Sequence, residues 1–161
     1  MRNLSDPFKC IVAIVVSELA GVIGSFFTSG SIDTWYAGLV KPALNPPAVV
    51  FGPVWITLYA LMGIALFLVW KRHSFLPLRV FRKAVSVFFI QLALNAVWSP
   101  IFFGLEDPLL AFFDIVLLWF AILYTTILFF RISRTAAYLL LPYLLWVTFA
   151  AYLNYAILTL N

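Results

Sequence analysis

Residues Pro47–Trp70, PAVVFGPVWITLYALMGIALFLVW, contain no charged side chain. About 20 apolar residues in a helix are enough to cross the roughly 30 Å hydrocarbon layer of a bilayer, so this segment is long enough to span a membrane. Four more apolar stretches of similar length flank it in the chain: Cys10–Ser29, Ala84–Leu105, Pro108–Phe130 and Ala136–Leu160. The sequence therefore predicts an all-α membrane protein, a bundle of five transmembrane helices.

The composition excludes several other classes of protein. Hydrophobic residues make up 65% of the chain and charged residues 10%, which fits neither a soluble enzyme nor a disordered regulator. Cys10 is the single cysteine and His73 the single histidine, so we expect no disulfide within the chain and no metal site. The net charge of +4 comes from basic residues that flank the apolar stretches, where they orient the chain in the bilayer, and we expect no nucleic-acid partner.

The connections between the predicted spans are short, with one exception. Short connections make consecutive helices antiparallel neighbours, so we expect residues 1–161 to form a single transmembrane domain. The connection from Gly30 to Pro46 is longer and contains turn-forming residues, two aromatic residues and a Lys-Pro pair. We interpret this first loop as a lid or rim over one end of the bundle.

The basic residues are divided unequally between the two ends of the predicted bundle. Nine lie at the end that holds the N-terminus, and only Lys41 lies at the other. Because positive charge favours the cytoplasmic side, this predicts a bacterial cell membrane protein with a cytoplasmic N-terminus and an external first loop. The nine residues are Arg2, Lys9, Lys71, Arg72, Arg79, Arg82, Lys83, Arg131 and Arg134.

Small residues recur every four positions in the first predicted span. Ala13, Ser17, Gly21 and Ser25 therefore share one helix face, which allows a second helix to come close. We favour packing within the bundle as the explanation, and homodimerisation is the alternative.

Three spans each carry a face that combines aromatic and polar residues. Amides in hydrocarbon need hydrogen-bond partners, so the face of the third span, which carries Gln91 and Asn95, should look into the bundle. Two interpretations of that face remain open, hydrogen bonding between helices and recognition of the polar edge of a bound ligand. The residues are Phe51, Trp55, Tyr59 and Met62 in the second span, Gln91, Asn95, Trp98, Ser99 and Phe102 in the third, and Tyr143, Trp146, Ala150 and Asn154 in the fifth.

Three segments carry a family resemblance. They are WYAGLVKPALNPPAVVFGPVWITLYALMG (35–63), QLALNAVWSPIFFGL (91–105) and LLPYLLWVTFAAYLNYAI (140–157). The pairs W-Y, K-P and P-P and the patterns W-x-x-L-Y, N-x-x-W-S-P and P-Y-L-x-W occur in the expected order. In these features the sequence resembles the translocator protein family (TspO/MBR, tryptophan-rich sensory proteins, peripheral benzodiazepine receptors) over nearly the whole chain.

The resemblance implies a five-helix bundle, commonly a homodimer, with a cavity between the helices beneath the first loop. It implies porphyrins and haem precursors as ligands rather than resident cofactors, together with synthetic benzodiazepine-type and isoquinoline compounds. Sterol binding is only weakly supported, because no basic residue follows Tyr155. Carried over residue by residue, the ligand-binding residues are Tyr36, Trp55, Asn95, Trp98, Ser99, Trp146, Ala150 and Asn154, and the lid residues are Trp35, Lys41, Pro42, Pro46 and Pro47.

The leading functional hypothesis is a membrane binding protein or sensor for flat, amphipathic tetrapyrroles. The alternatives are a transporter of such molecules and a protein that degrades porphyrin in light. The proposed cavity contains no histidine, cysteine or carboxylate, so we assign no catalytic residue.

Overall fold

The computed structural model describes residues 5–161, and within them five helices are long and apolar enough to cross a membrane. This confirms the predicted all-α membrane fold. Arg2, one of the nine basic residues noted in the sequence, lies outside the described residues. The five long helices are α1 (Asp6–Ser31), α3 (Ala48–Lys71), α4 (Leu78–Ser99), α5 (Pro108–Ile132) and α6 (Arg134–Leu160).

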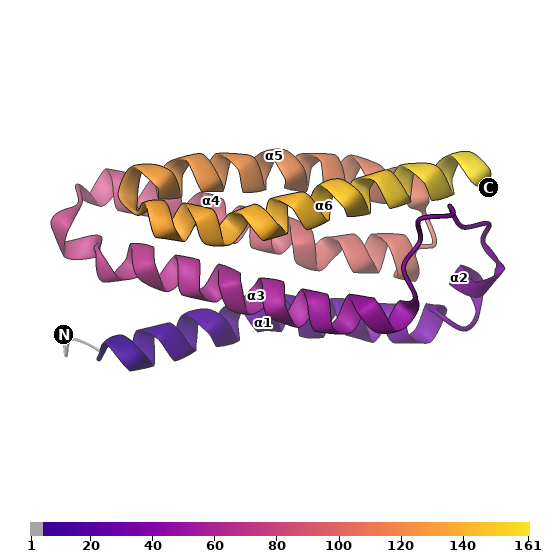
Figure 1. Cartoon of the computed structure of the whole chain (residues 1–161), viewed down its shortest axis with the longest axis horizontal. Coiled ribbons are helices and arrows are strands. Elements are labelled where there is room, and N and C mark those ends of the chain that lie inside the picture. The colour runs from indigo at the N-terminus through magenta and orange to yellow at the C-terminus, as the bar shows by residue number, and fades with distance from the viewer. Residues whose placement is uncertain (1–4) are drawn as a thin grey trace.

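The long helices lie side by side along one axis (Figure 1). The α5 and α6 helices form a hairpin, and α1 packs along α3. The first loop carries a short helix, α2 (Trp35–Gly38), which lies at the same end of the bundle as the C-terminus. The N-terminal part of α1 lies at the opposite end, together with the α3–α4 and α5–α6 connections (Figure 1).

Three helices begin earlier than hydrophobicity alone predicted, α6 by only two residues, at Arg134 rather than Ala136. The α4 helix starts at Leu78 rather than Ala84, directly after Pro77, and α1 starts at Asp6 rather than Cys10. Pro77 directly precedes the first turn of α4. The first backbone N–H groups of a helix have no intrahelical acceptor, so a proline, which has no N–H, is tolerated there. The added turns carry charged residues that can reach water at a membrane surface, so the helices extend beyond their apolar parts.

The end of α4 widens into a π-type turn over Pro100–Gly104. The Leu105 amide donates to the Pro100 carbonyl oxygen over 2.9 Å, a bond between residues five apart instead of four. Glu106 then adopts a positive φ of 55°, and the Asp107 carboxylate accepts from the Leu110 amide over 2.9 Å to cap α5. The turn therefore reverses the chain within a few residues.

Small residues allow α1 to approach α3 closely. Ala13 and Ser17 are buried, and a Cβ placed at Gly21 would lie 2.9 Å from Cδ2 of the Tyr59 ring. On the facing helix, a Cβ at Gly63 would overlap the backbone of Ile14. These contacts confirm that the first three small residues of the predicted stripe pack within the bundle.

The α1–α3 contact makes Gly63 sensitive to any added side-chain atom. We expect Gly63→Ala to lower the free energy of unfolding by about 1 to 3 kcal/mol, because the backbone of α1 must move to accommodate the methyl group. The matched control is Gly52→Ala in the same helix, where a Cβ meets nothing within 4 Å. Unfolding of both variants in a mixed-micelle denaturation series measures the difference, and equal stability of the two would contradict the close contact.

Candidate functional site

Asn95 lies at the centre of a buried hydrogen-bond chain between three helices. The Tyr59 hydroxyl on α3 donates to Asn95 Oδ1, and Asn95 Nδ2 donates to the Tyr143 hydroxyl on α6 over 3.0 Å. Asn95 is 6% exposed, and both tyrosines are buried as well. Of the two interpretations of this face, the geometry at Asn95 supports hydrogen bonding between helices.

Trp98 and Asn154 form a second polar link, nearer the lid. The Trp98 indole Nε1 donates to Asn154 Oδ1 over 3.2 Å, and Asn154 Nδ2 donates to the Pro108 carbonyl oxygen over 2.8 Å. The Trp98 ring also stacks on Phe102, with centroids 4.9 Å apart and an interplanar angle of 18°. These contacts join α4, α5 and α6 and fix the orientation of the indole.

Trp55 and Trp146 line the interior on α3 and α6. Trp55 stacks on Tyr59 at 5.4 Å and meets the Tyr143 ring edge-on at 6.2 Å. Trp146 meets Phe51 edge-on at 5.9 Å. Its indole nitrogen is buried and has no hydrogen-bond partner among residues 5–161. A buried indole N–H usually finds a partner, so this donor is free to bind an acceptor that reaches it.

Other predicted site residues occupy different positions. Ala150, one turn after Trp146 on α6, is half-buried and packs against the main core. Ser99 turns towards α1, where its hydroxyl lies 3.2 Å from that of Thr28 and beside Gly24. The structure thus groups Trp55, Trp146 and Ala150 around the main core and places Ser99 at the α1–α4 contact.

The lid helix packs on the π-type turn of α4. The Trp35 ring meets Phe102 edge-on at 5.5 Å, and the Tyr36 ring meets Phe103 edge-on at 5.6 Å. The Tyr36 hydroxyl donates to Asn45 Oδ1 over 3.1 Å. Burial raises the pKa of Tyr36, so its hydroxyl stays protonated and remains a donor at neutral pH.

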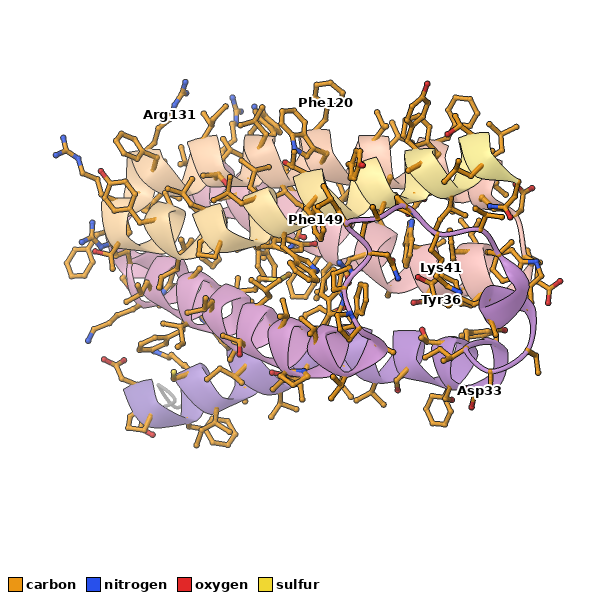
Figure 2. All side chains as sticks on the ribbon, turned by 45° about the vertical axis from the view of Figure 1, so that its right-hand side comes forward. Asp33, Tyr36, Lys41, Phe120, Arg131 and Phe149 are labelled. Atoms are coloured by element: carbon orange, nitrogen blue, oxygen red, sulfur yellow. The ribbon has the colours of Figure 1, made fainter. Side chains whose placement is uncertain are left out.

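Lys41 and the C-terminal residue hold the second half of the lid. The Lys41 ammonium lies 4.7 Å from the centre of the Tyr36 ring and donates to the Ala37 carbonyl oxygen over 3.3 Å. Figure 2 shows Lys41 and Tyr36 together at this end of the bundle. Asn161 pairs with both backbone groups of Val40, accepting from its amide over 2.9 Å and donating to its carbonyl over 3.1 Å.

The prolines of the lid shape the connection to α3. The backbone amide of Asn45 donates to the Pro42 carbonyl oxygen over 2.9 Å and closes a turn. The side-chain Nδ2 of Asn45 donates to the Pro46 carbonyl oxygen over 3.3 Å. Pro47 directly precedes α3. The sequence analysis did not identify Asn45 and Asn161, whose side chains hydrogen-bond within the first loop or to it. An asparagine before two prolines is a turn signal that could have indicated Asn45, but no pattern pointed to Asn161.

Some buried polar side chains have no hydrogen-bond partner among residues 5–161. Gln91 is 1% exposed, and neither its amide nitrogen nor its amide oxygen has a hydrogen-bond partner among residues 5–161. Asp114 Oδ2 on α5 is also buried without a partner there. Within the same described part of the chain, no group of three or more His, Cys, Asp or Glu side chains could hold a metal ion.

Comparison with known proteins reveals close relatives over most of the chain. Residues 13–160 match the TspO/MBR family. The tryptophan-rich protein TspO of Archaeoglobus fulgidus is 45% identical over 94% of this chain and 96% of its own. The protein of the same name from Chlorobaculum tepidum is 46% identical over 88% of each chain, and the human translocator protein is 43% identical over 87% of this chain and 82% of its own.

The hydrogen bonds of Asn95 make it a structural tie whose loss can be measured. Asn95→Leu should lower the free energy of unfolding by about 1 to 3 kcal/mol, because it leaves the buried Tyr143 hydroxyl without its donor. Tyr143→Phe removes the other partner of the same bond. If the bond carries the effect, the double variant should cost less than the sum of the two single variants in denaturation experiments. Additive losses would show that the two residues act independently.

Proposed function

The chain belongs to the TspO/MBR family, and on that premise we propose that it is an integral membrane protein that binds porphyrins and related tetrapyrroles between its helices. The ligand class follows from the family resemblance of the sequence. Such ligands are flat and apolar over their faces and carry carboxylates at their edge. They suit an interior lined by aromatic rings with a few polar groups.

The observation that carries this proposal is the buried indole N–H of Trp146. It lacks a hydrogen-bond partner among residues 5–161, and it lies in the part of the bundle that the resemblance assigns to the ligand. A buried donor without a partner costs about 1 to 3 kcal/mol, and a ligand carbonyl or carboxylate that accepts from it recovers part of that energy. The free donor therefore favours a ligand with acceptors at its edge.

Ligand entry requires movement of the lid. The interior rings of Trp55, Tyr59 and Tyr143 already contact one another, so a flat ligand inserts by separating aromatic neighbours. The lid is attached by its aromatic contacts to α4 and by the pairing of Asn161 with Val40. Opening these contacts exposes the region beneath, and Lys41 then supplies a positive charge at the rim for the carboxylates of the ligand.

A substitution that keeps an aromatic ring at position 146 but removes the indole N–H tests the proposed contact. Trp146→Phe should weaken protoporphyrin binding about five- to thirtyfold, the equivalent of about 1 to 2 kcal/mol for one lost hydrogen bond and part of a ring. Binding is followed by absorbance and by quenching of protein fluorescence, in the dark.

The matched control is Trp119→Phe, because the Trp119 indole already donates to Thr148 over 2.8 Å and lies outside the proposed site. Affinity should stay within about twofold of the original value in this variant. Equal affinity of both variants and the parent protein would reject Trp146 as a ligand contact. If the parent protein itself did not bind protoporphyrin, the proposed ligand class would be wrong.

The lid should become more protected when ligand is bound. Residues Gly30–Pro46 connect to the bundle through few contacts, so their amides should exchange faster than those of the long helices in the free protein. We expect exchange in this segment to slow at saturating protoporphyrin, with the α5–α6 connection unchanged as an internal reference. Unchanged exchange in Gly30–Pro46 would show that the segment does not close over the ligand.

A further inference from the structure

A cavity of about 480 Å³ opens beside the end of α3. That end of α3 lies at the end of the bundle opposite the first loop (Figure 1). It lies where α3 ends, where the short 3₁₀ helix η1 (His73–Phe75) follows, and where α6 begins. Its walls combine two basic side chains, two hydroxyls and two apolar side chains. These are Leu68, Lys71, Arg72, Phe75, Ser133 and Thr135.

This end of the molecule carries a large excess of positive charge. In the described chain, eight basic side chains lie in the first turns of α1 or around the α3–α4 and α5–α6 connections, against one acidic side chain, Asp6. Figure 2 shows one of them, Arg131, at the end of the bundle away from Lys41. The eight are Lys9, Lys71, Arg72, Arg79, Arg82, Lys83, Arg131 and Arg134.

The single acidic group does not neutralise the cavity. The Asp6 carboxylate lies 2.8 Å from the Lys71 ammonium and 3.9 Å from that of Lys9, so two lysines share one negative charge. Arg72 has no carboxylate partner among residues 5–161. The positive charge of Arg72 therefore remains at the cavity wall.

The Arg72 guanidinium is held in place by the backbone of the neighbouring helix pair. Its Nη1 donates to the Ile132 carbonyl oxygen over 2.5 Å, which ties the end of α3 to the α5–α6 connection. A guanidinium has five N–H donors, so most of them remain for an anion. Ser133 Oγ accepts from the Ala136 amide over 3.4 Å and keeps its own hydroxyl hydrogen as a donor.

The position of the cavity favours a lipid over a dissolved ion. Leu68 lies on the membrane-spanning part of α3, and Phe75 is 87% exposed beside the cavity. Charged and apolar walls thus meet where a membrane surface would lie, an arrangement that fits a phosphate with its acyl chains attached. We propose that this cavity binds the phosphate of an anionic phospholipid headgroup, with Arg72 and Lys71 as the cationic contacts, Ser133 and Thr135 as hydroxyl donors, and the acyl chains along Leu68 and Phe75.

The first test places a negative charge in the cavity and keeps the hydrogen bonds of Arg72 and Ser133 described above. Thr135 is exposed in the first turn of α6, where an acidic residue is compatible with the helix. Thr135→Asp should weaken phosphatidylglycerol binding at least about tenfold, because its carboxylate repels the phosphate. Thr135→Asn, nearly the same size but neutral and still a side-chain donor, should weaken binding much less than Thr135→Asp does, by less than about threefold. Native mass spectrometry of the full-length chain, titrated with phosphatidylglycerol in detergent, measures both.

A second pair of variants separates a defined site from general attraction to positive charge. Arg72→Gln and Arg79→Gln each remove one positive charge at the same end of the bundle, but only Arg72 lines the cavity. We expect Arg72→Gln to weaken phosphatidylglycerol binding at least about tenfold and Arg79→Gln to change it less than about threefold. Equal losses in the two variants would overturn the proposal, as would undiminished binding in Thr135→Asp.

The same titrations distinguish a lipid from a free phosphate ion. Phosphatidylglycerol should raise the melting temperature of the protein more than phosphatidylcholine does, and inorganic phosphate at millimolar concentration should leave it unchanged. Stabilisation by inorganic phosphate as large as that by phosphatidylglycerol would overturn the assignment to a lipid. Thr135 is exposed, so we expect the Thr135→Asp variant to fold, and its melting temperature provides the baseline for a cavity that does not bind the lipid.

Discussion

A side-chain amide buried in hydrocarbon has no water to bond with, and Asn95 meets this constraint by bonding to tyrosines on two other helices. The amide donates to one tyrosine and accepts from the other, so α3, α4 and α6 are fixed in register at one depth. Trp55 lies four residues before Tyr59, and Trp146 lies three residues after Tyr143. The same hydrogen bonds therefore set the positions of the indole rings around the proposed ligand site.

The lid depends on this arrangement only indirectly. It rests on Phe102 and Phe103, which belong to the π-type turn beyond Asn95, and it is tied at its other end by Asn161. Its contacts with the bundle include aromatic edges and two hydrogen bonds between the Asn161 side chain and the Val40 backbone, whereas the core below is closed by packing and buried hydrogen bonds. The fold thus combines a firmly packed core with a cover held by fewer and weaker contacts.

Much of the fold could be predicted from the sequence because spans such as Pro47–Trp70 are long and uncharged, a pattern that few other structures share. The limits of α4 could not, since hydrophobicity does not record that a helix continues through charged turns outside the apolar layer. The site was predictable as a set of helix faces, but periodicity cannot tell which neighbour receives each hydrogen bond. Asn95 and Ser99 share a face, yet one joins α3 to α6 and the other meets α1.

The π-type turn at Pro100–Gly104 constrains the number of residues at the end of α4 more than the identity of those residues. Each residue of an α-helix advances the chain by about 100° around its axis. One residue more or less before Phe102 would therefore turn Phe102 and Phe103, on which the lid packs, to another side of the bundle. The spans themselves would still cross the membrane and bury the same kinds of side chains. Variants of this fold could therefore exchange side chains freely along much of the outer surface of α4, while a change of a single residue in length at its end would leave the lid without a place to rest.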